Sequence, residues 1–158
     1  MSSSNEIQSL DAVDEAILGH LVNDGRLANN ALAARVGIAA STALARVRML
    51  VERGVIRGFT ADVDPAKVGS PVQAIIALRL RTHNPEHVLS FATRVAKLPE
   101  AIQSFHVSGT DDFLVHVAVR DPDALRQFVL NSLTADPSVA QAQTHLVFEH
   151  QRGHFMRR

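Results

Sequence analysis

The chain has 158 residues, which is enough for one medium-sized domain or two small ones. Its 16 basic side chains balance 16 acidic ones, so no overall charge attracts nucleic acid, and the lack of cysteine excludes disulfides, thiolate metal sites and a cysteine nucleophile. The apolar runs are too short to cross a bilayer and the first residues lack a signal-peptide core, so we expect a cytoplasmic protein with no membrane partner.

The N-terminal residues predict a polar tail followed by a helix. Residues 1–9 are small and polar, so we expect them to form a disordered tail. From residue 10, apolar side chains recur at helical spacing (Leu10, Val13, Ile17, Leu18 and Leu21). Asp11 is placed to cap the start of this helix, and Asn23-Asp24-Gly25 provides the turn that ends it.

Residues 27–58 predict two further helices joined by a tight turn. Gly37 lies where this turn needs a left-handed backbone, which glycine adopts without steric cost. The second helix is expected from about Ala40 to Arg53, because Gly54 follows in the position where glycine ends helices. Together with the preceding helix, this pattern predicts a winged-helix-like helix-turn-helix domain over 10–54, whose second helix enters the DNA major groove.

This second helix has two different faces when its residues are placed at about 100° intervals. The apolar face should point to the core (Ala40, Ala43, Leu44, Val47, Leu50 and Val51). On the other face and its flank we predict the DNA contacts (Ser41, Thr42, Ala45, Arg46, Arg48 and Met49). Hydroxyl groups bind phosphates or base edges, and arginine holds guanine or phosphate through two parallel bonds.

Local charge favours DNA over the alternative of a helical hairpin with a solvated face. Between Arg26 and Gly58 the acid Glu52 stands against six arginines (Arg26, Arg35, Arg46, Arg48, Arg53 and Arg57). Six arginines minus one acid leave five positive charges in this window. A local surplus of this kind is what binding to phosphates requires.

The next segment predicts a connector. Residues 55–64 alternate between apolar and polar side chains, as a strand does, and Asp64-Pro65 closes the run. Gly69-Ser70-Pro71 then marks the best domain boundary in the sequence. We therefore assign 55–71 to a connector strand and linker.

Residues 72–150 predict a sheet domain with two helices. Strand-like runs over 72–81, 102–107, 113–119 and 139–148 bracket helices that begin at Asn84-Pro85 and Asp121-Pro122. This βαββαβ order is the ferredoxin-like arrangement, so the whole chain is α+β. Helices should cover one face, and the other carries Leu114 and Ala118 beside polar residues, so we expect a second subunit there. A basic tail over 151–158 follows.

One loop of this domain predicts a small-molecule site. Ser108, Gly109, Thr110, Asp111 and Asp112 are typical of a hairpin turn, which is the simpler reading of them. They also suit an amino acid, because backbone N–H groups and Thr110 can receive a carboxylate while Asp111 or Asp112 receives an ammonium group. No catalytic constellation stands out, and the scattered histidines lack metal-ligand spacing, so we expect no catalytic or metal site.

In the order and spacing of these motifs the chain resembles the Lrp/AsnC (leucine-responsive/asparagine-responsive, feast/famine) transcriptional regulators. The resemblance covers roughly residues 10–150 and rests on short motifs (Leu10-Asp11 with Asp14, Ile17 and Leu18; Asp24-Gly25-Arg26; Leu50 with Gly54-Val55-Ile56; Asp64-Pro65; Gly69; Gly109; Asp112). It implies an N-terminal DNA-binding domain and a C-terminal domain that senses effectors, often amino acids. It also implies dimers that commonly assemble into octamers, with the effector bound between subunits near Gly109–Asp112. We expect no cofactor beyond that effector.

The chain departs from the family pattern around the DNA-reading helix. Ala39 stands where the family usually has serine, which removes an N-cap of about 1 kcal/mol unless Ser41 replaces it. Ala45 and Met49 stand where basic residues are common, so Arg46 and Arg48 should supply more of the contact. We therefore expect an altered base preference.

The function predicted from the sequence is a regulator that binds double-stranded promoter DNA, not an enzyme. Two alternatives stay open. Sirohaem decarboxylases resemble the same family, although such an enzyme would leave the arginine surplus without a role. An amino-acid sensor whose hairpin contacts another protein is the second alternative, and it would show no affinity for DNA at low salt.

Overall fold

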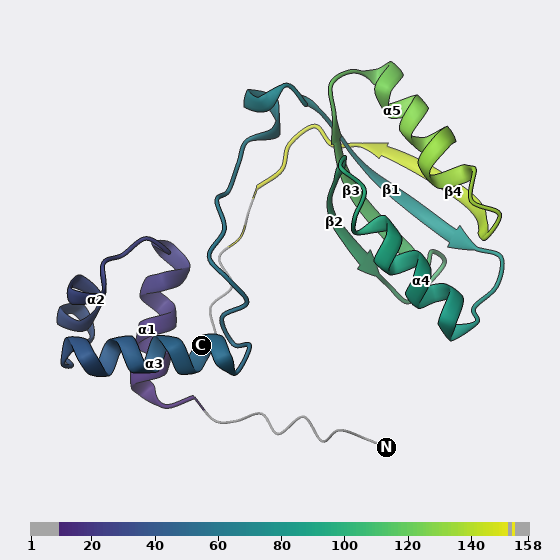
Figure 1. The fold of residues 1–158 in the computed structure, drawn as a ribbon. Coiled ribbons are helices and arrows are strands. Elements are labelled where there is room, and N and C mark those ends of the chain that lie inside the picture. Colours follow the sequence, from purple (N-terminus) through teal and green to yellow (C-terminus); the bar gives the residue numbers. More distant parts are fainter. Residues whose placement is uncertain (1–9, 152, 154–158) are drawn as a thin grey trace. The chain divides into compact units, whose positions relative to one another are not determined.

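The computed structural model describes residues 10–151 and residue 153, so the predicted tails over 1–9 and 151–158 lie outside the described residues, apart from Gln151 and Gly153. The chain divides into two compact units, one ending at Asp62 and the other spanning Val63–Gln151. Figure 1 shows the first as a group of helices and the second as a sheet with helices. The predicted α+β class is confirmed.

Three helices form the N-terminal unit: α1 (Ala12–Asn23), α2 (Asn29–Val36) and α3 (Ala40–Glu52). The Asp11 carboxylate accepts a hydrogen bond from the Asp14 backbone N–H at 2.8 Å, and Gly37 adopts a left-handed φ of 75° between α2 and α3. Ile17, Leu32 and Leu50 form one buried core between the helices. The predicted helix-turn-helix is therefore present.

The predicted strand over 55–64 is not formed. The backbone leaves α3 through Gly54, at a φ of 70°, and then runs without regular structure to the short 3-10 helix η1 (Pro65–Val68). Alternation creates a strand only where a neighbouring strand completes the hydrogen bonds, and no strand of the described residues pairs with this segment. The division between the two units lies within the segment that we assigned to the connector.

The C-terminal unit alternates strands and helices in the predicted order. Its elements are β1 (Val72–Leu80), α4 (Pro85–Val95), β2 (Ala101–His106), β3 (Phe113–Val119), α5 (Pro122–Phe128), a π-helical turn η2 (Val129–Thr134) and β4 (Val139–Leu146). The sheet order is β2-β3-β1-β4 with every pair antiparallel, which is the ferredoxin-like topology. Figure 1 shows α4 and α5 on the same face of the sheet.

The helices start where their caps predict. The Asn84 side chain accepts a hydrogen bond from the Glu86 N–H, and the Asp121 carboxylate accepts one from the Ala124 N–H. A proline follows each cap at the first helical position. The buried core then forms between helices and sheet, chiefly from aliphatic and phenylalanine side chains (Ile76, Leu78, Phe91, Val95, Phe113, Val115, Val117 and Leu133).

Among the described elements of this unit, no helix lies over the opposite face of the sheet. Strand register places Leu114 opposite both Ala77 and Phe105, and Phe105 is 50% exposed. His116 also belongs to this face but is buried, with its Nε2 2.9 Å from the Gln73 Oε1. Burial, and then the charge of His150, lower the His116 pKa. No helix among the described residues is long and apolar enough to cross a membrane.

Removing the α5 cap should destabilise the C-terminal unit. In Asp121→Ala the Ala124 N–H loses its acceptor, which we expect to cost about 1 kcal/mol. Amide hydrogen exchange of the β3 core reports the opening free energy of this unit. The matched control is Asp123→Ala in the same helical turn, because Asp123 makes only an exposed 3.6 Å ion pair with Arg126. Equal losses in the two variants would contradict the capping role.

Candidate DNA interface and effector loop

Helix α3 exposes most of the predicted contact residues. Ala43 and Leu50 are fully buried against the rest of the unit, and Val47 packs beside them. The outward-facing positions are exposed to solvent (Ser41, Thr42, Ala45, Arg48 and Met49). The polar face of α3 is therefore available to a partner over about three turns.

The buried stripe of α3 is narrower than predicted. Leu44 and Val51 were expected in the core, yet 41% and 43% of their surface is exposed. Residues 43, 47 and 50 alone meet the core, because α1 and α2 are short and cover only one side of α3. Leu44 and Val51 each lie one residue beyond this stripe, which turns them toward its edge.

Arg46 is held inside the unit. Its Nη1 donates to the Asp11 Oδ2 at 2.6 Å and to the Asp14 Oδ1 at 2.8 Å, and Asp14 is buried. These bonds connect α3 to the start of α1, 35 and 32 residues away in sequence. The sequence predicted Arg46 as a DNA contact, whereas the structure places its guanidinium between two carboxylates, and Arg48 keeps its side chain exposed.

The same ion pair changes the acidity of its members. The backbone N–H of Asp14 and then the Arg46 guanidinium lower the pKa of Asp11. The Asp14 and then the Asp11 carboxylates raise the pKa of Arg46. Arg46 and Asp11 are therefore both charged at neutral pH, and the guanidinium is neutralised from within the unit.

The start of α3 is held by a side chain that sequence reasoning missed. The Asn29 Nδ2, in the first turn of α2, donates to the Ala40 carbonyl at 2.8 Å. No side chain caps α3 at Ala39, and Ser41 does not replace the missing serine. The first N–H groups of α3 therefore have no side-chain acceptor.

Net charge of the whole unit is smaller than the window around α3 suggested. Over residues 10–62 the six arginines face six acids (Asp11, Asp14, Glu15, Asp24, Glu52 and Asp62), which leaves no net charge. Two of these acids bind Arg46. Attraction for phosphate must then come from the placement of exposed arginines rather than from the total charge of the unit.

The second candidate site is the loop between β2 and β3. Ser108, Gly109 and Thr110 are exposed, and Gly109 has a φ of 137°. The Thr110 hydroxyl is 3.4 Å from the Asp111 carboxylate, a long contact that costs little to break. These residues form the hairpin turn that the sequence predicted, and they leave polar groups open to a ligand.

Asp112 differs from the rest of this loop. Its Oδ2 accepts the Leu80 N–H at 2.7 Å, and its Oδ1 lies 2.8 Å from the His83 Nε2. Burial acts to raise the pKa of Asp112, but these two bonds lower it overall. Its carboxylate therefore holds the end of β1 and the following loop. Of the two predicted ammonium acceptors, Asp111 is the one whose carboxylate lacks a strong internal bond among the described residues.

Comparison with known proteins assigns both units. Residues 10–57 match the winged helix-turn-helix DNA-binding family, and residues 73–153 match the Lrp/AsnC ligand binding domain. The chain belongs to the Lrp/AsnC family. It is 46% identical over 154 residues to the HTH-type transcriptional regulator AldR of Mycobacterium tuberculosis, covering 96% of this chain and 86% of AldR. It is 34% identical over 142 residues to the leucine-responsive regulatory protein of Escherichia coli, covering 90% and 87%.

Solved Lrp/AsnC structures agree with this assignment. The crystal structure of M. tuberculosis AldR superposes with a TM-score of 0.78 at 44% identity, covering 91% of this chain and 98% of AldR. A transcriptional regulator from Neisseria meningitidis, solved as an L-Met complex, gives a TM-score of 0.83 at 32% identity, covering 92% and 94%. The chain is therefore a DNA-binding transcriptional regulator with a ligand-binding domain, and the expectation that it is not an enzyme is confirmed by its relatives.

Substitution of the two central arginines of α3 should have different effects on DNA binding. Arg48→Ala removes an exposed cation, so the slope of log K against log salt should fall in magnitude by about 0.9. Arg46→Ala should leave this slope unchanged but lower the melting temperature of the N-terminal unit, because buried Asp14 loses its partner.

Fluorescence anisotropy with a labelled duplex over a salt series measures both slopes. Arg126→Ala, in the other unit, is the matched control and should retain the wild-type slope. An equal fall in slope for the Arg46 and Arg48 variants would show that Arg46 leaves its carboxylates to bind phosphate.

Proposed function

We propose that this regulator binds promoter DNA sequence-specifically as a dimer or higher oligomer, and that an amino acid changes its oligomeric state or its DNA affinity. The observation that carries the proposal is the exposed polar face of α3 in a chain whose other unit matches a ligand-binding domain. In a dimer, two such helices would read half-sites about 34 Å apart.

Each exposed group of α3 has a distinct role in this proposal. Arg48 is the principal cation for a base edge or a phosphate. Ser41 and Thr42 bind the DNA backbone near the uncapped start of the helix, where free N–H groups and the helix dipole favour a phosphate. Ala45 and Met49 lie against base edges as apolar contacts, such as with a thymine methyl group.

The effector is proposed to bind at the loop over Ser108–Asp111. Exposed backbone N–H groups and the Thr110 hydroxyl would receive the carboxylate, and Asp111 would receive the ammonium group. Asp112 supports this loop from behind through Leu80 and His83. The L-Met complex of the N. meningitidis relative supports an amino acid as the ligand class.

The oligomer is proposed to form over the helix-free face of the sheet. Leu114, Ala118 and the exposed Ile75 and Phe105 belong to this face, and a second copy would remove their apolar surface from water. Family resemblance suggests further assembly of these dimers into octamers. A regulator of this kind acts in the cytoplasm, where its DNA is.

A charge at the centre of this face should prevent the oligomer from forming. Leu114→Glu places like charges against each other across a two-fold interface, so sedimentation equilibrium should give the mass of a single chain. Leu89→Glu is the control, because Leu89 is 69% exposed on α4 and belongs to the other face of the unit. Circular dichroism checks that both variants are folded. An unchanged mass for Leu114→Glu would contradict the interface.

The function itself is tested by capture of genomic DNA. The protein is incubated with sheared DNA from its own host at low and high salt, and the retained fragments are sequenced. Enrichment of a few upstream regions at the higher salt, changed by one amino acid of a panel, is the expected result. Uniform retention that vanishes with salt would contradict sequence-specific binding, and no retention at all would favour a sensor that does not bind DNA.

A further inference from the structure

A side chain of α2 joins the start of that helix to the start of α3. The Asn29 Nδ2 donates to the Ala40 carbonyl at 2.8 Å, and the two residues lie 11 positions apart, each the first residue of its helix. A backbone carbonyl only accepts hydrogen bonds, so the amide nitrogen of Asn29 is the atom that must face it. Both residues are half-buried, which strengthens the bond by limiting competition from water.

This bond matters because the local sequence does little to hold the first turn of α3. Ala28 and Ala39 occupy the N-cap positions of α2 and α3, and alanine has no side-chain oxygen to accept from the first N–H groups. The turn between the helices contains Gly37, the residue with the most backbone freedom, at a φ of 75°. The turn alone would therefore leave α3 free to swing relative to α2.

The Asn29 amide supplies a second point of attachment. Helix α2 has eight residues, so its two ends are roughly 10 Å apart. The turn at Gly37 connects the end of α2 to α3, whereas Asn29 connects the start of α2 to the same first turn of α3. Two attachments separated by most of the length of α2 remove a freedom that one attachment would leave.

We propose that Asn29 is a positioning residue for DNA recognition, which holds the first turn of α3 so that Ser41 and Thr42 reach the DNA backbone. These two residues directly follow Ala40 and are exposed. Contacts to the DNA backbone set the register in which base edges are read, so a displaced first turn weakens specific binding more than non-specific binding. The inference rests on the proposed function, in which α3 reads DNA, and adds a residue outside α3 on which that reading depends.

The Asn29 contact differs in kind from the ion pair of Arg46. Arg46 lies further along α3 and binds carboxylates at the start of α1, whereas Asn29 binds the beginning of α3 from α2. Asn29 is also uncharged, so its loss leaves the electrostatic attraction of the unit for phosphates unchanged. A test can therefore separate the position of α3 from the charge that it carries.

Four variants of the full chain test this role. Asn29→Ala removes the donor while favouring the helix, and Asn29→Gln keeps an amide donor on a side chain one methylene longer. Asn30→Ala is the matched control, because Asn30 is the exposed neighbour in the same helical turn and its side chain has no hydrogen bond among the described residues. Arg48→Ala tests separately whether α3 reads DNA. Each protein is incubated with sheared genomic DNA from the host at low and high salt, and the retained fragments are sequenced.

We expect Asn29→Ala to retain as much DNA as the wild type at low salt, because no charge is lost. At the higher salt the enrichment of upstream regions should fall about fivefold, the usual effect of losing one neutral hydrogen bond. Asn29→Gln should recover part of this enrichment, and Asn30→Ala should keep all of it. Circular dichroism at the temperature of the capture checks that each variant is folded.

The remaining outcomes separate this inference from the proposed function. Wild-type enrichment by Asn29→Ala, with enrichment lost in Arg48→Ala, would overturn the positioning role and leave the proposed function intact. An equal fall in low-salt retention and in enrichment for Asn29→Ala would show that Asn29 only stabilises the unit, which also overturns the role. The lack of any enriched region with the wild-type protein would overturn the proposed function and this inference with it.

Discussion

The ion pair of Arg46 with Asp11 and Asp14 is the constraint on which the DNA-binding unit depends. Three short helices share a core built around Ile17, Leu32 and Leu50 with partly buried apolar side chains packed against it, and such apolar contacts are not directional. The Arg46 guanidinium, bound to two carboxylates at the start of α1, is a directional contact that fixes the rotation of α3 about its axis. The residues that α3 exposes to solvent are therefore determined in part by an ion pair within the unit.

Local signals in the sequence were enough to predict most of the fold. Asp11, Asn84 and Asp121 cap helices through groups two or three residues away, and Gly37 requires only its own backbone freedom. The order of strands followed from apolar runs such as 113–119, which became β3 without change. Each of these features depends on residues within one helical turn or one strand, so it can be predicted without knowing which distant residues come into contact.

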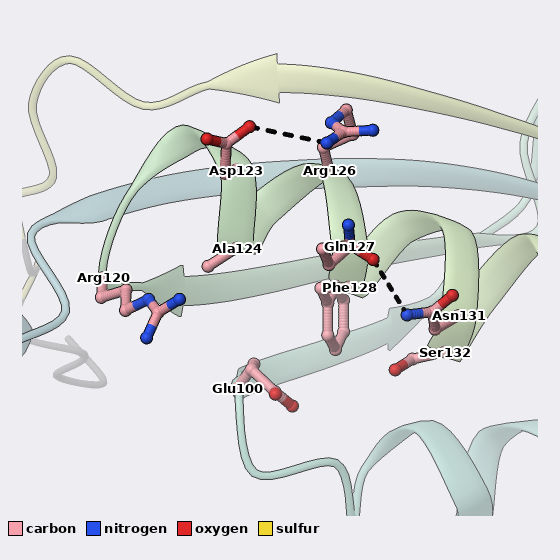
Figure 2. A pocket seen from close by; sticks show the side chains of 9 residues that line it. All are labelled: Glu100, Arg120, Asp123, Ala124, Arg126, Gln127, Phe128, Asn131 and Ser132. Carbon is pink, nitrogen blue, oxygen red and sulfur yellow. Dashed lines mark hydrogen bonds and ion pairs between the residues drawn. The ribbon is translucent and has the colours of Figure 1, made fainter.

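The features that the sequence did not predict depended on partners that are distant in the sequence. Arg46 binds carboxylates more than 30 residues away, and Asp112 binds the Leu80 N–H and His83. Alternation over 55–64 resembles a strand, but a strand exists only with a neighbour. The hollow lined by Glu100, Arg120 and residues of α5 and η2 (Figure 2) was not predicted, because Glu100 and the helical residues come from separate parts of the chain.

The two units also differ in how far apart in the sequence their contacting residues lie. This difference affects the order in which the two units fold. The bond between Arg46 and Asp11 in the helical unit joins residues 35 apart in sequence, whereas β1 pairs with β4 across the span from Ala74 to Leu146. Local contacts form quickly, and long-range antiparallel pairing must first overcome the entropy of closing a long loop. Synthesis proceeds from the N-terminus, so residues 10–54 leave the ribosome before β4 does, and we expect the helical unit to form on the nascent chain before the sheet is complete.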